Sequence, residues 1–192
     1  MKKANYLLIL AASIVSLQNA RATTVIPPTF DELVDQAEVI FQGNVTRVRS
    51  EWVGEGAQRH IVSYISFNVE DNVKGNAGKT YTIRMFGGTV DGETMAASDA
   101  PKFKVGDKDI LFVQNNGSQF VPLVGIMHGR FHVKREQSGQ EVVTTNDGEP
   151  VKNVARLGRE HAAEASSAER TFSPDDLKAA VKSRLNRVEY ER

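Results

Sequence analysis

The chain has 192 residues, with 24 basic side chains, 24 acidic side chains, four histidines and no cysteine. Without cysteine, the fold depends on its core rather than on disulfides, and thiol catalysis, thiolate zinc sites and iron–sulfur clusters are excluded. The balanced charge argues against nucleic acid as a partner, because binding phosphate needs a basic surface.

The N-terminal residues have the order of a secretory signal peptide. Two lysines follow Met1, an apolar run covers Tyr6–Leu17, and Ala20 and Ala22 supply the small side chains that a signal peptidase reads before Thr23. At about 1.5 Å per helical residue, the run reaches about 18 Å, against about 30 Å for the hydrocarbon core of a bilayer. We therefore expect residues 1–22 to be cleaved rather than to anchor the chain.

The expected mature chain is exported, either to the periplasm or to the medium. Removing residues 1–22 takes away three basic residues and no acidic one, which leaves 21 basic and 24 acidic side chains. No other segment approaches the length of a membrane span, so we expect no stable membrane insertion. The expected partner is another exported protein, and no nucleic acid.

The first predicted elements are a short helix and two long strands. Thr29 and Glu32 form a capping box after paired prolines, which predicts a helix over 30–37. A strand follows over 39–52, where the apolar positions change phase and predict a β-bulge near Gly43. Residues 59–73 alternate between apolar and polar side chains, which is typical of a half-buried strand.

Shorter strands and turns follow. Residues 80–86 predict a third strand, which Gly87 and Gly88 are expected to end. Asp91-Gly92 favours a tight hairpin, because both central residues of that turn type have positive φ. Residues 96–108 predict a connecting loop.

The most apolar strand is predicted over 109–113. Asn116-Gly117 predicts a hairpin turn, with a partner strand over 119–124 that Pro122 interrupts. Residues 130–134 and 141–144 predict a final hairpin.

The C-terminal region predicts a linker and a helix. Residues 155–170 carry almost no large apolar side chains and predict a linker or a weak solvated helix. Ser173, Pro174 and two acidic residues then mark a helix start. The predicted helix has an apolar stripe made of Leu177, Ala180, Val181, Leu185 and Val188. The chain therefore divides into a β domain over 23–154, a linker over 155–172 and an amphipathic helix within 173–192.

Six to eight short strands with helices only at the ends predict a mainly β fold, either a small antiparallel OB-like barrel or a sandwich. The segments Phe41–Val45, Val73–Gly75 and Phe103–Val113 together resemble the core pattern of bacterial exported proteins whose barrel is similar to that of netrin domains and metalloprotease inhibitors. The resemblance spans residues 38–134 and implies an OB barrel. Animal inhibitors of this fold chelate the protease zinc through an N-terminal cysteine. This chain has none, so that mechanism is not carried over.

His128 and His132 are candidate metal ligands, since residues four apart on a strand point to one face. On a straight strand their Cα atoms are about 13 Å apart. That is too far for two metal bonds of about 2 Å without a bend at Gly129. We favour the alternative of two packed or surface histidines. The sequence contains no G-x-S-x-G motif, phosphate loop or calcium loop, and it predicts no catalytic residue, metal or cofactor.

Two features are candidates for protein binding. The stretch 122–131 is apolar but broken by one proline and two glycines, which favours partial exposure of its side chains. Its candidate binding residues are Leu123, Ile126, Met127, His128 and Arg130. Trp52, the only tryptophan, ends the first long strand and is a candidate anchor. The alternatives are a bulged core strand and a packing cap.

The sequence as a whole favours an exported binding module that engages another protein, with a secreted protease as one candidate. We expect binding rather than catalysis. One alternative is a metal-assisted hydrolase that uses His128 and His132. Another is an envelope-structural subunit whose C-terminal helix packs on a second chain.

Overall fold

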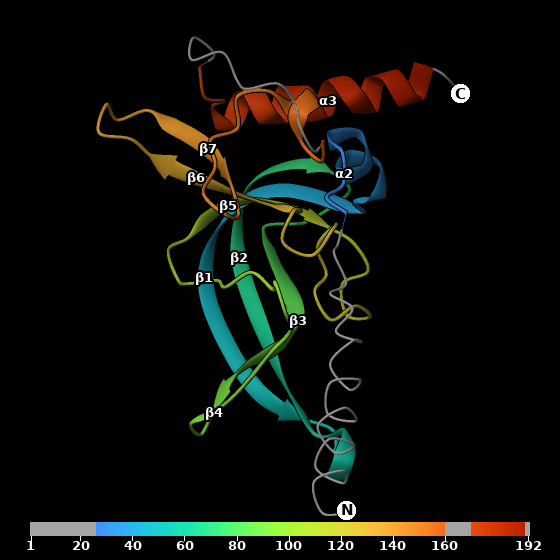
Figure 1. Cartoon of the computed structure of the whole chain (residues 1–192), viewed down its shortest axis with the longest axis vertical. Helices are drawn as coiled ribbons and strands as arrows, with labels where there is room; N and C mark the ends of the chain where they lie inside the picture. Colours follow the sequence, from blue (N-terminus) through green and yellow to red (C-terminus); the bar gives the residue numbers. More distant parts are fainter. Residues whose placement is uncertain (1–25, 160–169, 191–192) are drawn as a thin grey trace, which may run out of the picture.

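The computed structural model describes residues 26–159 and 170–190 (Figure 1). The predicted leader and its cleavage site at Ala20, Ala22 and Thr23 lie outside these residues. The helices are α2 (Phe30–Gln36) and α3 (Pro174–Tyr190), with 3-10 turns η1 (Gly56–Gln58) and η2 (Val154–Arg156). The strands are β1 (Val39–Val53), β2 (His60–Lys74), β3 (Thr80–Val90), β4 (Glu93–Ala96), β5 (Lys108–Val113), β6 (Arg130–Arg135) and β7 (Glu141–Thr145).

All seven strands pair antiparallel in one sheet, in the order β4-β3-β2-β1-β5-β6-β7. This confirms the predicted mainly β fold with one N-terminal and one C-terminal helix. Within the described residues the outer strands β4 and β7 do not pair with each other, so the hydrogen-bonded ladder stays open. Figure 1 shows β1 to β3 bending along the long axis of the molecule, with α2 and α3 at one end and β4 at the other.

Strand β1 changes its neighbours midway. Residues 40–44 pair with β5 on one side and β2 on the other, whereas residues 47–53 pair with β2 alone. Register shifts at Gln42/Gly43 and Val45/Arg47 confirm the predicted bulge. Glycine is needed at position 43, because a Cβ there would lie 2.6 Å from the backbone oxygen of Asn68.

Two sequence predictions about strands are wrong. Gly87 and Gly88 do not end the third strand; β3 continues to Val90, and the glycines mark where it exchanges β2 for β4 as its partner. Residues 119–124 do not form a strand, because Pro122 lacks an N–H and pairing with β5 is limited to one bridge at Leu123. The hairpin at Asp91-Gly92 is confirmed, with φ of 52° and 83°.

Buried side chains form one cluster on each face of the sheet. In β5, Ile110 and Phe112 belong to the cluster beneath the helices, whereas Leu111 and Val113 belong to the cluster on the opposite face. This double burial explains why β5 is an unbroken apolar run.

Helix α3 packs on its own chain. Leu177 and Val181 are completely buried in the cluster that also contains α2. At its start, Asp176 accepts hydrogen bonds from the guanidinium of Arg170 and from the backbone and hydroxyl of Ser173, which hold the pKa of that carboxyl well below its usual range. Neither helix that the structure describes has the length and apolarity needed to cross a bilayer.

Candidate functional site

The main candidate site is a cavity of about 700 Å³ that is lined by β1 to β4 and the loop after β4. Figure 1 shows β4 at the end of the molecule away from the helices. Its floor comes from β1, β2 and β3, including Val48, Ser50, Ile65 and Met85. Its remaining walls come from β4 and from residues 97–103 of the following loop. This volume lies within the range of about 300–1,000 Å³ that is usual for ligand pockets, and its lining is largely apolar as in such pockets.

The two glycines of β3 give the cavity its shape. Gly88 has a φ of 139°, and a Cβ there would lie 2.4 Å from the hydroxyl oxygens of both Ser50 and Ser63. Glycine therefore allows β3 to pass directly over this serine pair while it turns toward β4.

The serine pair is the polar feature of the cavity floor. Ser63 donates its hydroxyl hydrogen to the backbone oxygen of Gly87 at 2.6 Å, and the two serine hydroxyl oxygens are 2.8 Å apart. Because Ser63 has one hydrogen to give, Ser50 donates to Ser63 and keeps its own lone pairs as acceptors. These bonds place no base beside either hydroxyl in the described structure, so this arrangement provides a hydrogen-bond acceptor rather than an activated nucleophile.

A free strand edge borders the cavity. The backbone of Val45 forms hydrogen bonds with the backbone of Gly106 and Asp107. No described strand pairs with the outer edge of the residues that follow, 46–53. Val48 lies on this edge, lines the cavity and is 39% exposed. The cavity therefore opens to solvent beside a row of backbone groups that have no partner strand in the described structure.

The structure separates the binding residues suggested by the sequence. Trp52 is partly buried at the end of β1, where the guanidinium carbon of Arg59 lies 4.0 Å from its ring centroid. Leu123 is 1% exposed and belongs to the core cluster. Ile126 has a φ of 62° and lines a second cavity, of about 380 Å³, which shares Ala97 with the main one.

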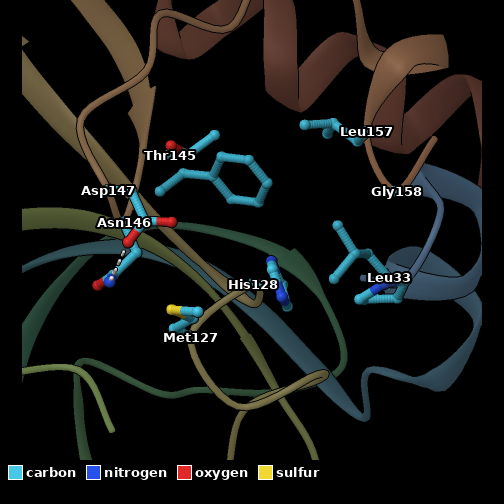
Figure 2. Close-up of a pocket in the computed structure, with 10 residues that line it drawn as sticks. Leu33, Met127, His128, Thr145, Asn146, Asp147, Leu157 and Gly158 are labelled. Atoms are coloured by element: carbon cyan, nitrogen blue, oxygen red, sulfur yellow. Dashed lines mark hydrogen bonds between the residues drawn. The ribbon is translucent and has the colours of Figure 1, made fainter. Parts of the chain in front are cut away.

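Met127 and His128 line a different and much smaller pocket, of about 40 Å³ (Figure 2). Figure 2 shows the His128 ring between the side chains of Met127 and Leu33. Burial lowers the pKa of His128, against an opposing attraction to Asp147. A space of this size accommodates water rather than a partner's side chain.

Arg130 is 2% exposed and holds the loop that walls the main cavity. It donates to Asp109 Oδ2 at 2.9 and 3.1 Å, to Asp107 Oδ2 at 2.8 Å and to the backbone oxygen of Lys102 at 2.7 Å. Its guanidinium carbon also lies 4.0 Å from the ring centroid of Phe103, which lines the cavity. Arg130 is therefore a positioning residue for the cavity wall.

The two candidate metal ligands have different surroundings. His132 Nδ1 lies 2.8 Å from Oδ1 of the completely buried Asp109, whereas His128 occupies the small pocket described above. Among residues 26–159 and 170–190, no three histidine, aspartate or glutamate side chains are grouped to hold a metal ion.

The serine pair and the free edge are not among the features predicted from the sequence. A signal for the serines was nevertheless present, because a hairpin that turns over residues 54–59 sets Ser50 opposite Ser63, as the observed register does. The free edge depends on where β5 stops pairing with β1, which no local pattern encodes. In comparisons with known proteins, no protein-family model matches the chain, and no curated protein sequence matches it.

Proposed function

We propose that this chain is an exported binding protein that takes up an extended segment of another protein as an additional strand beside β1. The observation that carries the proposal is the position of Val48, which is exposed on a free strand edge and also lines the main cavity. Strand addition uses this combination, because the edge supplies main-chain hydrogen bonds and neighbouring pockets select alternate side chains.

The two faces of β1 define the chemistry of the incoming strand. Val48 and Ser50 face the cavity, so the added strand, about 4.8 Å away, places every second side chain over an apolar surface. Arg47 and Arg49 are exposed on the opposite face, where Arg49 already forms an ion pair with Glu51. The segment that fits alternates apolar residues with acidic or polar ones.

The partner class is another exported protein, with a secreted protease as one candidate. That candidate comes from the resemblance of the sequence to inhibitors with an OB barrel. Their cysteine-dependent contact with zinc is not available to this chain, and pairing at the β1 edge provides a different contact.

The structure favours this proposal over the two alternatives. A hydrolase that uses His128 and His132 requires the two rings to act together, yet one lines a small pocket and the other bonds Asp109. A structural subunit that docks through the C-terminal helix requires a free apolar stripe, yet Leu177 and Val181 are buried within their own chain.

The test is affinity capture with the full chain, produced in its native cell with a C-terminal tag, followed by hydrogen exchange on the isolated complex. We expect an exported partner that protects backbone amides of residues 46–53. Val48→Arg places a charge at the cavity mouth and should abolish capture. Val105→Arg is the matched control, because Val105 is also exposed but does not line the cavity.

Two outcomes would overturn the proposal. One is recovery of no partner above an untagged control. The other is a complex that forms equally well with Val48→Arg and leaves the exchange of residues 46–53 unchanged.

A further inference from the structure

A separate cavity of about 280 Å³ lies where β1, the start of β7 and the first turn of α3 meet. It shares no residue with the main cavity. Six of its seven lining residues are polar or charged, and the full set is Gln42, Gln140, Glu141, Ser173, Pro174, Asp175 and Lys178.

Gln42 contributes a buried acceptor to this cavity. Its side chain is 6% exposed, and Nε2 donates to Glu70 Oε2 at 2.8 Å. This bond fixes the amide orientation, because the reversed amide would turn its oxygen toward a carboxylate. Oε1 is buried and has no hydrogen-bond partner within the described structure. Gln42 thus brings to the cavity wall a buried acceptor that lacks a donor in the described structure.

On one side of the cavity, Lys108 joins two carboxylates. Its Nζ lies 3.2 Å from Glu70 and 3.1 Å from Glu141. The exposed Arg135 reaches Glu141 at 3.6 Å from outside. Glu70 also accepts from Asn44 at 2.6 Å, so both of its oxygens are engaged. Of these two acids, Glu141 is the one that lines the cavity.

On the other side, Lys178 joins two more carboxylates. Its Nζ lies 2.9 Å from both Asp71 and Asp175. The two sides together contain four carboxylates and three basic side chains, which are two lysines and Arg135. The cluster therefore has one excess negative charge. An entering cation is therefore favoured over an anion.

The start of α3 does not reverse this preference. Asp176 already accepts from the backbone N–H of Ser173 at 2.8 Å, and Ser173 Oγ accepts from the backbone N–H of Asp176 at 3.2 Å. The helix start is thus capped by its own side chains, which leaves fewer free N–H groups for an anion.

We propose that this cavity binds a primary ammonium group. Such a group brings positive charge and three N–H donors, which match the Gln42 carbonyl oxygen and the carboxylates of Glu141 and Asp175. Lysine side chains and free polyamines share this chemistry. The site is independent of strand addition at β1, because none of its residues belongs to that edge.

The test is an NMR titration of the full chain with n-butylammonium chloride at constant ionic strength, which follows the backbone amides of the lining residues Glu141, Ser173 and Lys178 in every variant and, where it is present, the side-chain amide of Gln42. We expect saturable shifts. Tetramethylammonium has the same charge without N–H donors, so it should bind at least ten times more weakly. Gln42→Met should weaken n-butylammonium binding at least fivefold, and Gln140→Met, at the exposed rim, less than twofold.

Asp175→Asn provides a second variant, because the exposed side chain of Asp175 is not part of the core; the change should weaken binding severalfold. Equal binding of the two cations, or unchanged affinity in both Gln42→Met and Asp175→Asn, would overturn the proposal. Separate titrations with spermidine and with Nα-acetyl-lysine methylamide then distinguish a polyamine from a lysine side chain.

Discussion

Replacing Arg130 with methionine tests whether the buried ion pair holds the cavity wall. The change keeps an unbranched side chain but removes every hydrogen bond to Asp109, Asp107 and Lys102. Asp109 is 0% exposed and retains only His132 among its side-chain partners in the described structure. Breaking a buried pair from one side costs about 3–5 kcal/mol, because the remaining charge is left without its partner.

Urea unfolding followed by circular dichroism measures this loss. With a denaturant slope of about 2 kcal/mol per M, a cost of about 4 kcal/mol lowers the midpoint by about 2 M. Arg135→Met is the matched control on the same strand; its side chain is exposed, so its unfolding free energy should change by less than about 0.5 kcal/mol.

A double variant separates the unpaired charge from lost packing. Asp109→Leu combined with Arg130→Met removes both charges and should recover part of the loss, because apolar replacements of buried pairs are often close to neutral. A midpoint for Arg130→Met within about 0.5 M of the unmodified chain would refute the reasoning.

Three further predictions concern stability. Gly88→Ala should cost about 1–3 kcal/mol more than Gly106→Ala in urea unfolding, since both positions have positive φ but only the first lacks room for a Cβ. Thr29→Ala removes the capping box of α2 and should lower the unfolding free energy by about 1 kcal/mol, as thermal melting can check. The pKa of His128 is lower in the folded chain than its ordinary value of 6.5. Its contribution to the free energy of unfolding is therefore complete above pH 6.5 and is lost as pH falls through the lowered pKa. The urea midpoint of His128→Gln should therefore fall less than that of the unmodified chain between pH 7.5 and pH 5.

Local chemistry made part of the fold predictable from the sequence. The capping box of Thr29 and Glu32 and the paired positive φ of Asp91-Gly92 depend on residues within four positions of one another. The bulge at Gly43 was visible because it shifts the phase of the apolar pattern within one strand.

The unpredicted features depend on contacts between distant residues. Gly87 and Gly88 have the composition of a strand end, yet β3 continues because β4 offers a new partner. The sequence alone favours Arg130 as an exposed binding residue, because nothing near it in the chain predicts its buried partner. That partner is Asp109, 21 positions earlier. The main cavity arises in the same way, since Ser50 and Ser63 meet only through strand register.

The two halves of β1 should differ in hydrogen exchange. Residues 40–44 have a strand on each side and buried side chains on both faces, so their amides should exchange only through global unfolding. Along residues 46–53, amides that point toward β2 should be protected, whereas alternate amides that point outward should exchange within seconds to minutes. The free chain, measured by NMR at several pH values, provides the comparison within a single strand. Uniform slow exchange over 46–53 would mean that another segment covers this edge, and strand addition by a partner would then require that segment to leave first.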